Sequence, residues 1–151
     1  MSDVISIPIP TDDDGYILLQ CSYCGEFFKL TGDDIESDQI LNVYCPSCGL
    51  ISENYMTDEV VNLAMTKAQN YAMDLIYDAF KEMERSTRKG PLQIKAGKRP
   101  DHEHESPIRS GIEALEITEF PCCKRTAKIK SLLKFTGCRC PFCGVIDFEI
   151  E

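Results

Sequence analysis

The pattern of hydrophobic and polar positions predicts several short strands and one long helix. Three isoleucines alternate with polar residues or proline near the start, and an acidic run that ends at Gly15 indicates a turn, so residues 1–15 are expected to form an extended lead-in. A polar, acidic connection is predicted between the second and the third of the strands that follow. These strands are predicted at residues 16–19, 26–30 and 40–44.

Residues 57–89 have the period of an amphipathic helix. Apolar side chains recur at steps of three and four residues from Val61 to Met83, which places them on one helical face. Thr57 is suited to cap the first turn, and Gly90 followed by proline ends the pattern. Such a helix would be about 45 Å long. Its apolar face is expected either to cover other parts of its own chain or to pair with a second copy in a homodimer.

Residues 90–111 are rich in proline, glycine and charge, and we expect them to form a flexible linker. The linker holds the two histidines of the chain, His102 and His104, in the stretch DHEHE. Alternating histidine and acid can chelate a metal, but a solvated loop is the expected role of this stretch. From Ile112 the apolar pattern returns, and residues 112–151 are expected to form a second module.

Nine cysteines in 151 residues indicate either a disulfide framework or metal ligation. The first fifteen residues have no basic start, no apolar run of signal-peptide length and no small-residue cleavage site, so a cytoplasmic protein is expected. Thiols stay reduced in that compartment. The cysteines are therefore predicted to bind metal.

Four cysteines in residues 16–56 have the spacing of a tetrahedral metal site. They form two C-x-x-C-G motifs, CSYCG and CPSCG, with twenty residues between the inner cysteines. In such a motif the backbone N–H groups point at the sulfurs, and the glycine permits the positive φ that closes the turn. One zinc ion is therefore predicted on Cys21, Cys24, Cys45 and Cys48.

The second module repeats the first imperfectly. The stretch CPFCGVI, residues 140–146, matches CPSCGLI, residues 45–51. Upstream, the two modules align so that Phe120 stands where the first module has Cys21. One expected ligand is therefore displaced in this half of the chain.

Two further cysteines can supply the missing ligand. Cys122 lies in the first turn of the second module, and Cys138 lies two residues before Cys140, on the same side of a strand. Cys122 is favoured because it belongs to the turn itself. A second zinc ion is thus predicted, with Cys122, Cys123, Cys140 and Cys143 as its ligands.

These motifs resemble those of zinc ribbons, especially the transcription-factor-IIB-type ribbons found in many small prokaryotic proteins. The resemblance covers residues 16–53 well and residues 112–150 loosely. The expected fold class is α+β, with two small zinc-ribbon β-hairpin modules joined by the long helix and the flexible linker. The resemblance also implies that the metal is structural and that the ribbon surface binds nucleic acid or another protein.

Charge is distributed unevenly along the chain, whose formal net charge is −9. Residues 1–80 hold two Lys or Arg and fourteen Asp or Glu, whereas residues 81–139 hold fourteen and eight. The basic second module is therefore predicted to bind nucleic acid, which favours a transcription-type regulator or a subunit of a complex. The candidate residues for this contact are Arg125, Lys128, Lys130, Lys134 and Arg139.

The same cations have an alternative role. They could offset the acidic first module and the anionic thiolate sites, within the chain or across a dimer. The protein would then be a protein–protein adaptor that acts through its acidic ribbon and its helix.

The cysteine motifs also leave a choice of metal. They are similar to the iron-binding knuckles of rubredoxin-type electron carriers, and four thiolates suit iron as well as zinc. A closed site of four thiolates has no open position for water or substrate, so no enzymatic activity is expected. Neither a membrane nor a small-molecule substrate is expected as a partner.

Overall fold

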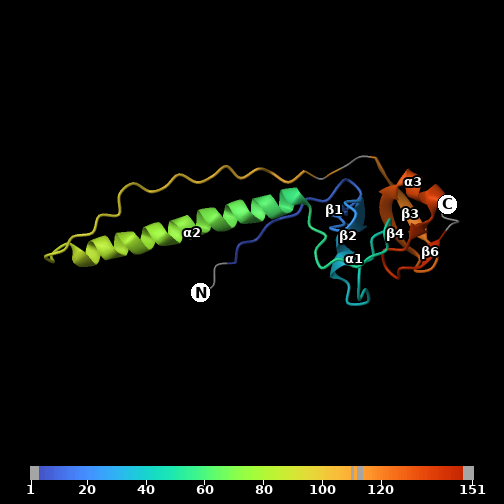
Figure 1. Ribbon diagram of the computed structural model, residues 1–151, viewed down its shortest axis with the longest axis horizontal. Coiled ribbons are helices and arrows are strands. Elements are labelled where there is room, and N and C mark those ends of the chain that lie inside the picture. The colour runs from blue at the N-terminus through green and yellow to red at the C-terminus, as the bar shows by residue number, and fades with distance from the viewer. Residues whose placement is uncertain (1–3, 110, 112–113, 148–151) are drawn as a thin grey trace. The chain divides into compact units, whose positions relative to one another are not determined.

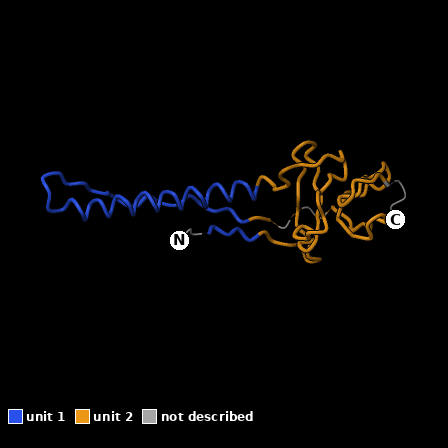
Figure 2. Tube along the Cα trace, turned by 90° about the horizontal axis from the view of Figure 1, so that it is seen from below, with its two compact units in different colours: residues 1–8, 59–107 blue, residues 9–58, 108–151 orange. Residues whose placement is uncertain are grey.

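The computed structural model of this chain describes residues 4–109, 111 and 114–147. The described residues form two compact units, coloured separately in Figure 2. The ribbon unit comprises residues 9–58 and 108–147, and the helix unit comprises residues 4–8 and 59–107. In the described part of the chain, no helix is both long and apolar enough to cross a membrane.

The ribbon unit is built on one four-stranded antiparallel sheet with the strand order β1-β2-β4-β3 (Figure 1). The first half of the unit, residues 9–58, contributes the hairpin of β1 and β2, and the second half, residues 108–147, contributes the hairpin of β3 and β4. The hairpins join where Lys29 pairs with Lys128. The prediction of two separate ribbon modules therefore differs from the structure, because the halves share a sheet. The strands are β1 (Tyr16–Gln20), β2 (Phe27–Thr31), β3 (Leu115–Phe120) and β4 (Arg125–Lys130).

A short helix follows each hairpin: α1 (Gly32–Glu36) after β2, and α3 (Ser131–Thr136) after β4. The acidic connection that the sequence predicts after the second strand is therefore partly helical. Its first turn is capped, because the hydroxyl of Thr31 accepts a hydrogen bond of 3.2 Å from the Asp34 N–H.

The segments that carry the later cysteines contain little strand. In the first half, Tyr44 makes an isolated bridge to Ile51 in place of the strand predicted at residues 40–44. In the second half, β5 (Cys138–Arg139) pairs with β6 (Ile146–Asp147). The predicted start of the second module at Ile112 and its last four residues lie outside the described residues.

An approximate two-fold axis relates the two halves. Lys29 and Lys128 occupy equivalent positions in the two hairpins and pair directly with each other. The segments that carry the later cysteines of the two halves also pair with each other through equivalent residues. The Tyr44 N–H donates to the Pro141 carbonyl at 2.8 Å, and the Arg139 N–H donates to the Pro46 carbonyl at 3.0 Å.

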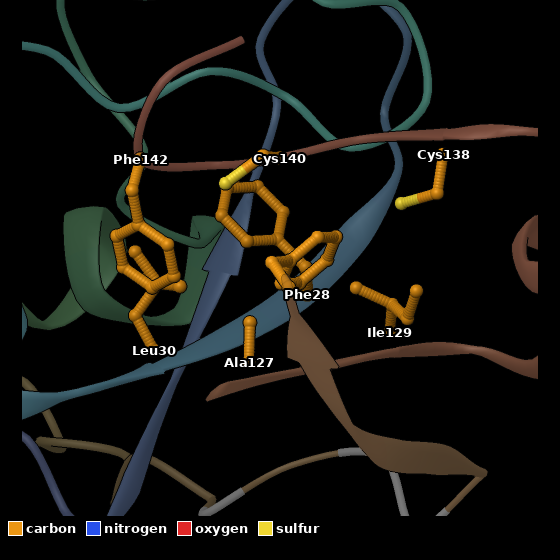
Figure 3. Close-up of a cluster of buried hydrophobic side chains, with 8 residues drawn as sticks. Phe28, Leu30, Ala127, Ile129, Cys138, Cys140 and Phe142 are labelled. Atoms are coloured by element: carbon orange, nitrogen blue, oxygen red, sulfur yellow. The ribbon is translucent and has the colours of Figure 1, made fainter. Parts of the chain in front are cut away.

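A single hydrophobic core lies on one face of the shared sheet (Figure 3). Side chains alternate between the two faces of each strand, so each hairpin directs part of its side chains into this core. The segment that carries the last cysteines closes the core with its own side chains. The buried cluster consists of Phe28, Leu30, Phe120, Ala127, Ile129, Cys138, Cys140 and Phe142.

Besides residues 4–8, the helix unit contains α2 (Asp58–Thr87) and an extended segment, residues 90–107, which we call the strap. The predicted helix is thus present over 30 residues. The strap runs back along α2, as both Figure 1 and Figure 2 show. This differs from the flexible linker that the composition of the segment predicts.

The strap is held by hydrogen bonds from the polar side of α2. Asn70, which is only 3% exposed, accepts from the Glu103 N–H at 2.9 Å and donates to the Glu103 carbonyl at 3.1 Å. Asp74 binds Arg99 at 2.9 Å and His102 at 2.9 Å. The buried side-chain amide of Asn70 thus makes both hydrogen bonds to the backbone of Glu103. In a sheet, a neighbouring strand would make such bonds to an extended segment.

Candidate metal centres

Cys21, Cys24, Cys45 and Cys48 form the first group of thiols, and their sulfur atoms all lie within 4.8 Å of one another. The Sγ atoms of Cys21 and Cys48 are 3.7 Å apart, and those of Cys24 and Cys45 are 3.5 Å apart. A tetrahedral zinc ion, with bonds of about 2.3 Å, holds its sulfurs about 3.8 Å apart. The structure therefore brings these four cysteines together at the spacing that such an ion needs.

Tight backbone turns aim the first group of thiols. The Gly25 N–H donates to the Cys21 carbonyl at 2.9 Å, and the Gly49 N–H donates to the Cys45 carbonyl at 2.9 Å. Both glycines have a positive φ, 75° and 73°, which residues with a side chain rarely adopt. The glycine that ends each C-x-x-C-G motif thus closes the turn that points two sulfurs the same way.

Backbone N–H groups also stabilise thiolates in these turns. Burial alone would raise the pKa of Cys21, but hydrogen bonds from the backbone of Cys24 and Tyr23 outweigh it and lower that pKa. The turn therefore supplies partial positive charge to a sulfur that must ionise before it can bind a metal.

Cys122, Cys123, Cys140 and Cys143 form the second group, with sulfur atoms again within 4.8 Å of one another. The Sγ atoms of Cys122 and Cys143 are 3.3 Å apart. The later turn repeats the geometry of the first half, since the Gly144 N–H donates to the Cys140 carbonyl at 2.8 Å. The second half therefore also gathers four sulfurs around one point.

The earlier turn of this half keeps its backbone but changes its side chains. The Lys124 N–H donates to the Phe120 carbonyl at 2.7 Å, in the way that Gly25 donates to Cys21. Lys124, with a φ of 53°, is the one non-glycine residue in the described ranges that has a positive φ. Phe120 is buried in the core, and the thiol comes from Cys122 two residues later.

Cys138 lies outside the second group of thiols. Its side chain is buried in the hydrophobic core that Figure 3 shows, and its Sγ lies 3.4 Å from the Arg139 carbonyl oxygen. The structure thus places Cys122, and not Cys138, beside the other three cysteines. The fifth cysteine of this half is a core residue.

Metal binding at both groups of thiols is coupled to the loss of protons from the cysteines. Burial raises the pKa of Cys45 and Cys140 well above their usual range, and it raises the pKa of Cys122 to about 11. Metals bind thiolates, so metal binding must release protons from these side chains. Four thiolates this close together would repel one another unless a cation shares their charge. The donor set therefore fits a divalent metal ion that prefers sulfur, zinc or iron, at each group.

Four of the five cations predicted to bind nucleic acid are paired with acids of the same chain. Arg125 binds Asp34 of α1. The Lys130 Nζ lies 2.7 Å from Glu26, and the Lys134 Nζ lies 3.2 Å from Glu116. The fourth of these cations is Lys128, and the fifth predicted residue, Arg139, lies against Gly49 with its side chain.

Asp12 holds Lys128 and its equivalent Lys29 together. The two Nζ atoms lie 2.7 Å and 3.0 Å from the same Asp12 oxygen, and Asp14 adds a contact of 2.7 Å to Lys128. Burial alone would raise the pKa of Asp12, but hydrogen bonds from Lys128, the Tyr16 N–H and Lys29 hold that pKa well below its usual range. Lys128 therefore stabilises the joint between the hairpins, where it is almost fully buried.

Comparison with known proteins gives no relative for this chain. No known protein family matches the sequence, and neither a curated protein nor a solved structure is significantly similar to it.

Proposed function

We propose that this chain is a non-enzymatic zinc-binding adaptor, in which two structural zinc ions hold the ribbon unit together and the protein surface binds another protein. The observation that carries the proposal is the pair of four-thiol groups on one shared sheet. Four thiolates fill a tetrahedral zinc site and leave no position for water or substrate. Bound zinc would supply folding free energy to this small unit rather than chemistry.

The ion pairs of the second half favour a protein partner over nucleic acid. Phosphate groups would have to displace acids that already neutralise four of the predicted cations. The net charge of −9 also opposes the approach of a polyanion. Exposed acids of the first half suit a basic protein surface instead, and they are Asp13, Asp33, Glu36 and Asp38.

Native mass spectrometry of the full chain tests the metal part of this proposal. We expect a mass that corresponds to two zinc ions per chain. A chain purified with iron would support the electron-carrier alternative and overturn structural zinc. A chain with one metal would contradict the assignment of the second group.

A binding titration tests the class of partner. Fluorescence anisotropy with duplex DNA and single-stranded RNA should show no binding tighter than the weak, non-specific range of about 1 to 100 μM at physiological salt. Tighter binding that is lost in Lys130→Glu would restore the nucleic-acid hypothesis. Lys98→Glu is the matched control, because Lys98 is a largely exposed lysine of the strap.

A further inference from the structure

The strap covers the polar side of α2 and leaves its apolar side exposed. Its hydrogen bonds reach Asn70, Asp74 and Glu84, which recur at helical spacing on one side of the helix. The large apolar side chains lie on the other side and are 46% to 66% exposed. They are Met65, Leu75, Ile76, Phe80 and Met83.

This apolar face is interrupted only at its edges, where the exposed Gln69 and Glu82 lie. Alanines and Val61 fill the positions between the large side chains, and the stripe runs from Val61 to Met83 over about 33 Å. A contiguous apolar surface of this length is unusual on a protein that does not associate. The strap cannot serve as the cover, since it already occupies the opposite side.

We propose that α2 pairs in antiparallel orientation with α2 of a second copy of this chain, through the apolar face. This deepens the proposed adaptor function, on which it rests for the role of the helix as a binding surface. The product would be a dimer in which the two copies of α2 cover each other's apolar face.

The distribution of side-chain size favours a second copy in this orientation. The N-terminal half of the stripe is rich in small residues, Ala64, Ala68 and Ala72. The C-terminal half carries the bulky Ile76 and Phe80. Antiparallel pairing sets the bulky half of each helix against the small half of the other, which fills the interface evenly. Parallel pairing would set bulky against bulky and small against small.

Charge at the helix ends favours the same orientation. The first turn of α2 carries Asp58 and Glu59, the last turn carries Arg85, and Arg88 directly follows the end of the helix, all exposed. Antiparallel pairing brings each acidic end to a basic end and opposes the two helix dipoles. Parallel pairing would bring like charges together at both ends.

The mass of the zinc-loaded full chain in solution, measured by sedimentation equilibrium, tests the pairing. We expect a dimer, twice the chain mass of 17.0 kDa. Phe80→Glu should raise the dimer dissociation constant at least about a hundredfold, because each dimer loses two buried aromatic contacts. The matched control is Phe135→Glu in α3, where the ring is 86% exposed and off the helix, and it should leave the dimer intact. A monomeric wild-type chain, or a dimer that survives Phe80→Glu with its helix intact by circular dichroism, would overturn the proposal.

The orientation has its own test in charge reversal. Arg85→Glu combined with Arg88→Glu should weaken an antiparallel dimer about tenfold, and adding Asp58→Lys and Glu59→Lys should restore it. In a parallel dimer the first pair of changes would replace one like-charge contact by another and leave association unchanged, which would overturn the antiparallel arrangement. Zinc content separates this inference from the proposed function. A monomer that holds two zinc ions contradicts only the pairing, and a metal-free dimer contradicts only the zinc-binding function.

Discussion

The two halves of the ribbon unit share a backbone plan but place the first cysteine of each four-thiol group differently. In the first half, Cys21 is a buried thiol and Gly25 closes its turn. In the second half, Phe120 and Lys124 occupy these two positions, and the thiol is the exposed Cys122. The hydrogen bond that closes the turn is present in both halves. The turn is therefore the same in both halves. Its first residue, however, carries a thiol in the first half and a core ring in the second.

This exchange follows from the sharing of one core. The first half contributes a ring at Phe28, where the second half has the small Ala127. The second half contributes a ring at Phe120, where the first half has Cys21. Two halves that close around a single core need complementary side chains rather than identical ones, since the interior is close-packed. The imperfect repeat in the sequence reflects this requirement.

Removal of both metal ions should have the largest effect on this shared structure. Structural zinc in small domains contributes roughly 10–16 kcal/mol, which is comparable to the whole stability of an average domain. After chelation of the full chain, we expect the amide signals of the sheet to lose their dispersion in NMR spectra. A ribbon unit that keeps its dispersed signals without metal would contradict a structural role for the thiols.

Removal of one sulfur should distinguish the proposed ligand Cys122 from the core residue Cys138. Cys122→Ser should reduce the metal content from two ions to one, measured by native mass spectrometry. Cys138→Ala is the matched control and should retain two ions, at a cost of about 1–3 kcal/mol in unfolding free energy for the core contacts that it removes. The opposite outcome, with metal lost in Cys138→Ala and retained in Cys122→Ser, would reverse the assignment.

Neutralisation of Asp12 should weaken the joint between the halves. Asp12→Asn leaves two buried ammonium groups without their shared carboxylate, so we expect a loss of about 3–5 kcal/mol in unfolding free energy by denaturant titration. Because the pKa of Asp12 is lowered in the folded state, its contribution is complete above a pH of about 4 and is lost as the pH falls further. Replacing Lys29 and Lys128 by methionine in the same chain should recover most of the loss.

The neighbouring Asp13 supplies the control for this experiment. It is exposed, so Asp13→Asn should change the unfolding free energy by less than about 0.5 kcal/mol. Equal effects of Asp12→Asn and Asp13→Asn would show that the buried lysines do not depend on Asp12.

Exchange of the turn residues between the halves should have the smallest effect. Gly25→Lys forces a side chain into a positive-φ turn and should destabilise the unit by about 1–2 kcal/mol, although the space around it is open. Lys124→Gly removes the same strain from the second half and should stabilise it by at most about 1 kcal/mol. Thermal unfolding of the zinc-loaded chain measures both, and shifts of the same sign would contradict the equivalence of the two turns.

The sequence was sufficient for the local structure of the thiol groups. The C-x-x-C-G motifs predict turns whose geometry depends on neighbouring residues alone, and the glycines at 25, 49 and 144 have the required positive φ. The long helix was also predictable, because its period extends over many turns. For the displaced ligand the sequence left two candidates, Cys122 and Cys138, because the choice depends on which of the two side chains packs into the core.

The sequence was not sufficient for the contacts between distant segments. Lys128 alternates with Lys130 on a strand that reads as basic in the sequence. Its partner Asp12 is distant along the chain, in the lead-in. The strap has the composition of a flexible linker, and its order depends on the buried Asn70 in the middle of a helix. Local patterns do not show such pairings, which is why the ribbon halves were predicted as separate modules.

Amide hydrogen exchange of β1 and β2 in the Cys122→Ser chain shows whether the two halves unfold as one unit, because this change removes a sulfur only from the proposed metal site of the other half. If the halves share one sheet and one core, exchange in residues 16–31 should accelerate relative to the wild-type chain with two zinc ions. Unchanged exchange in these residues, with β3 and β4 exchanging freely, would show two independent modules and contradict a shared sheet and core.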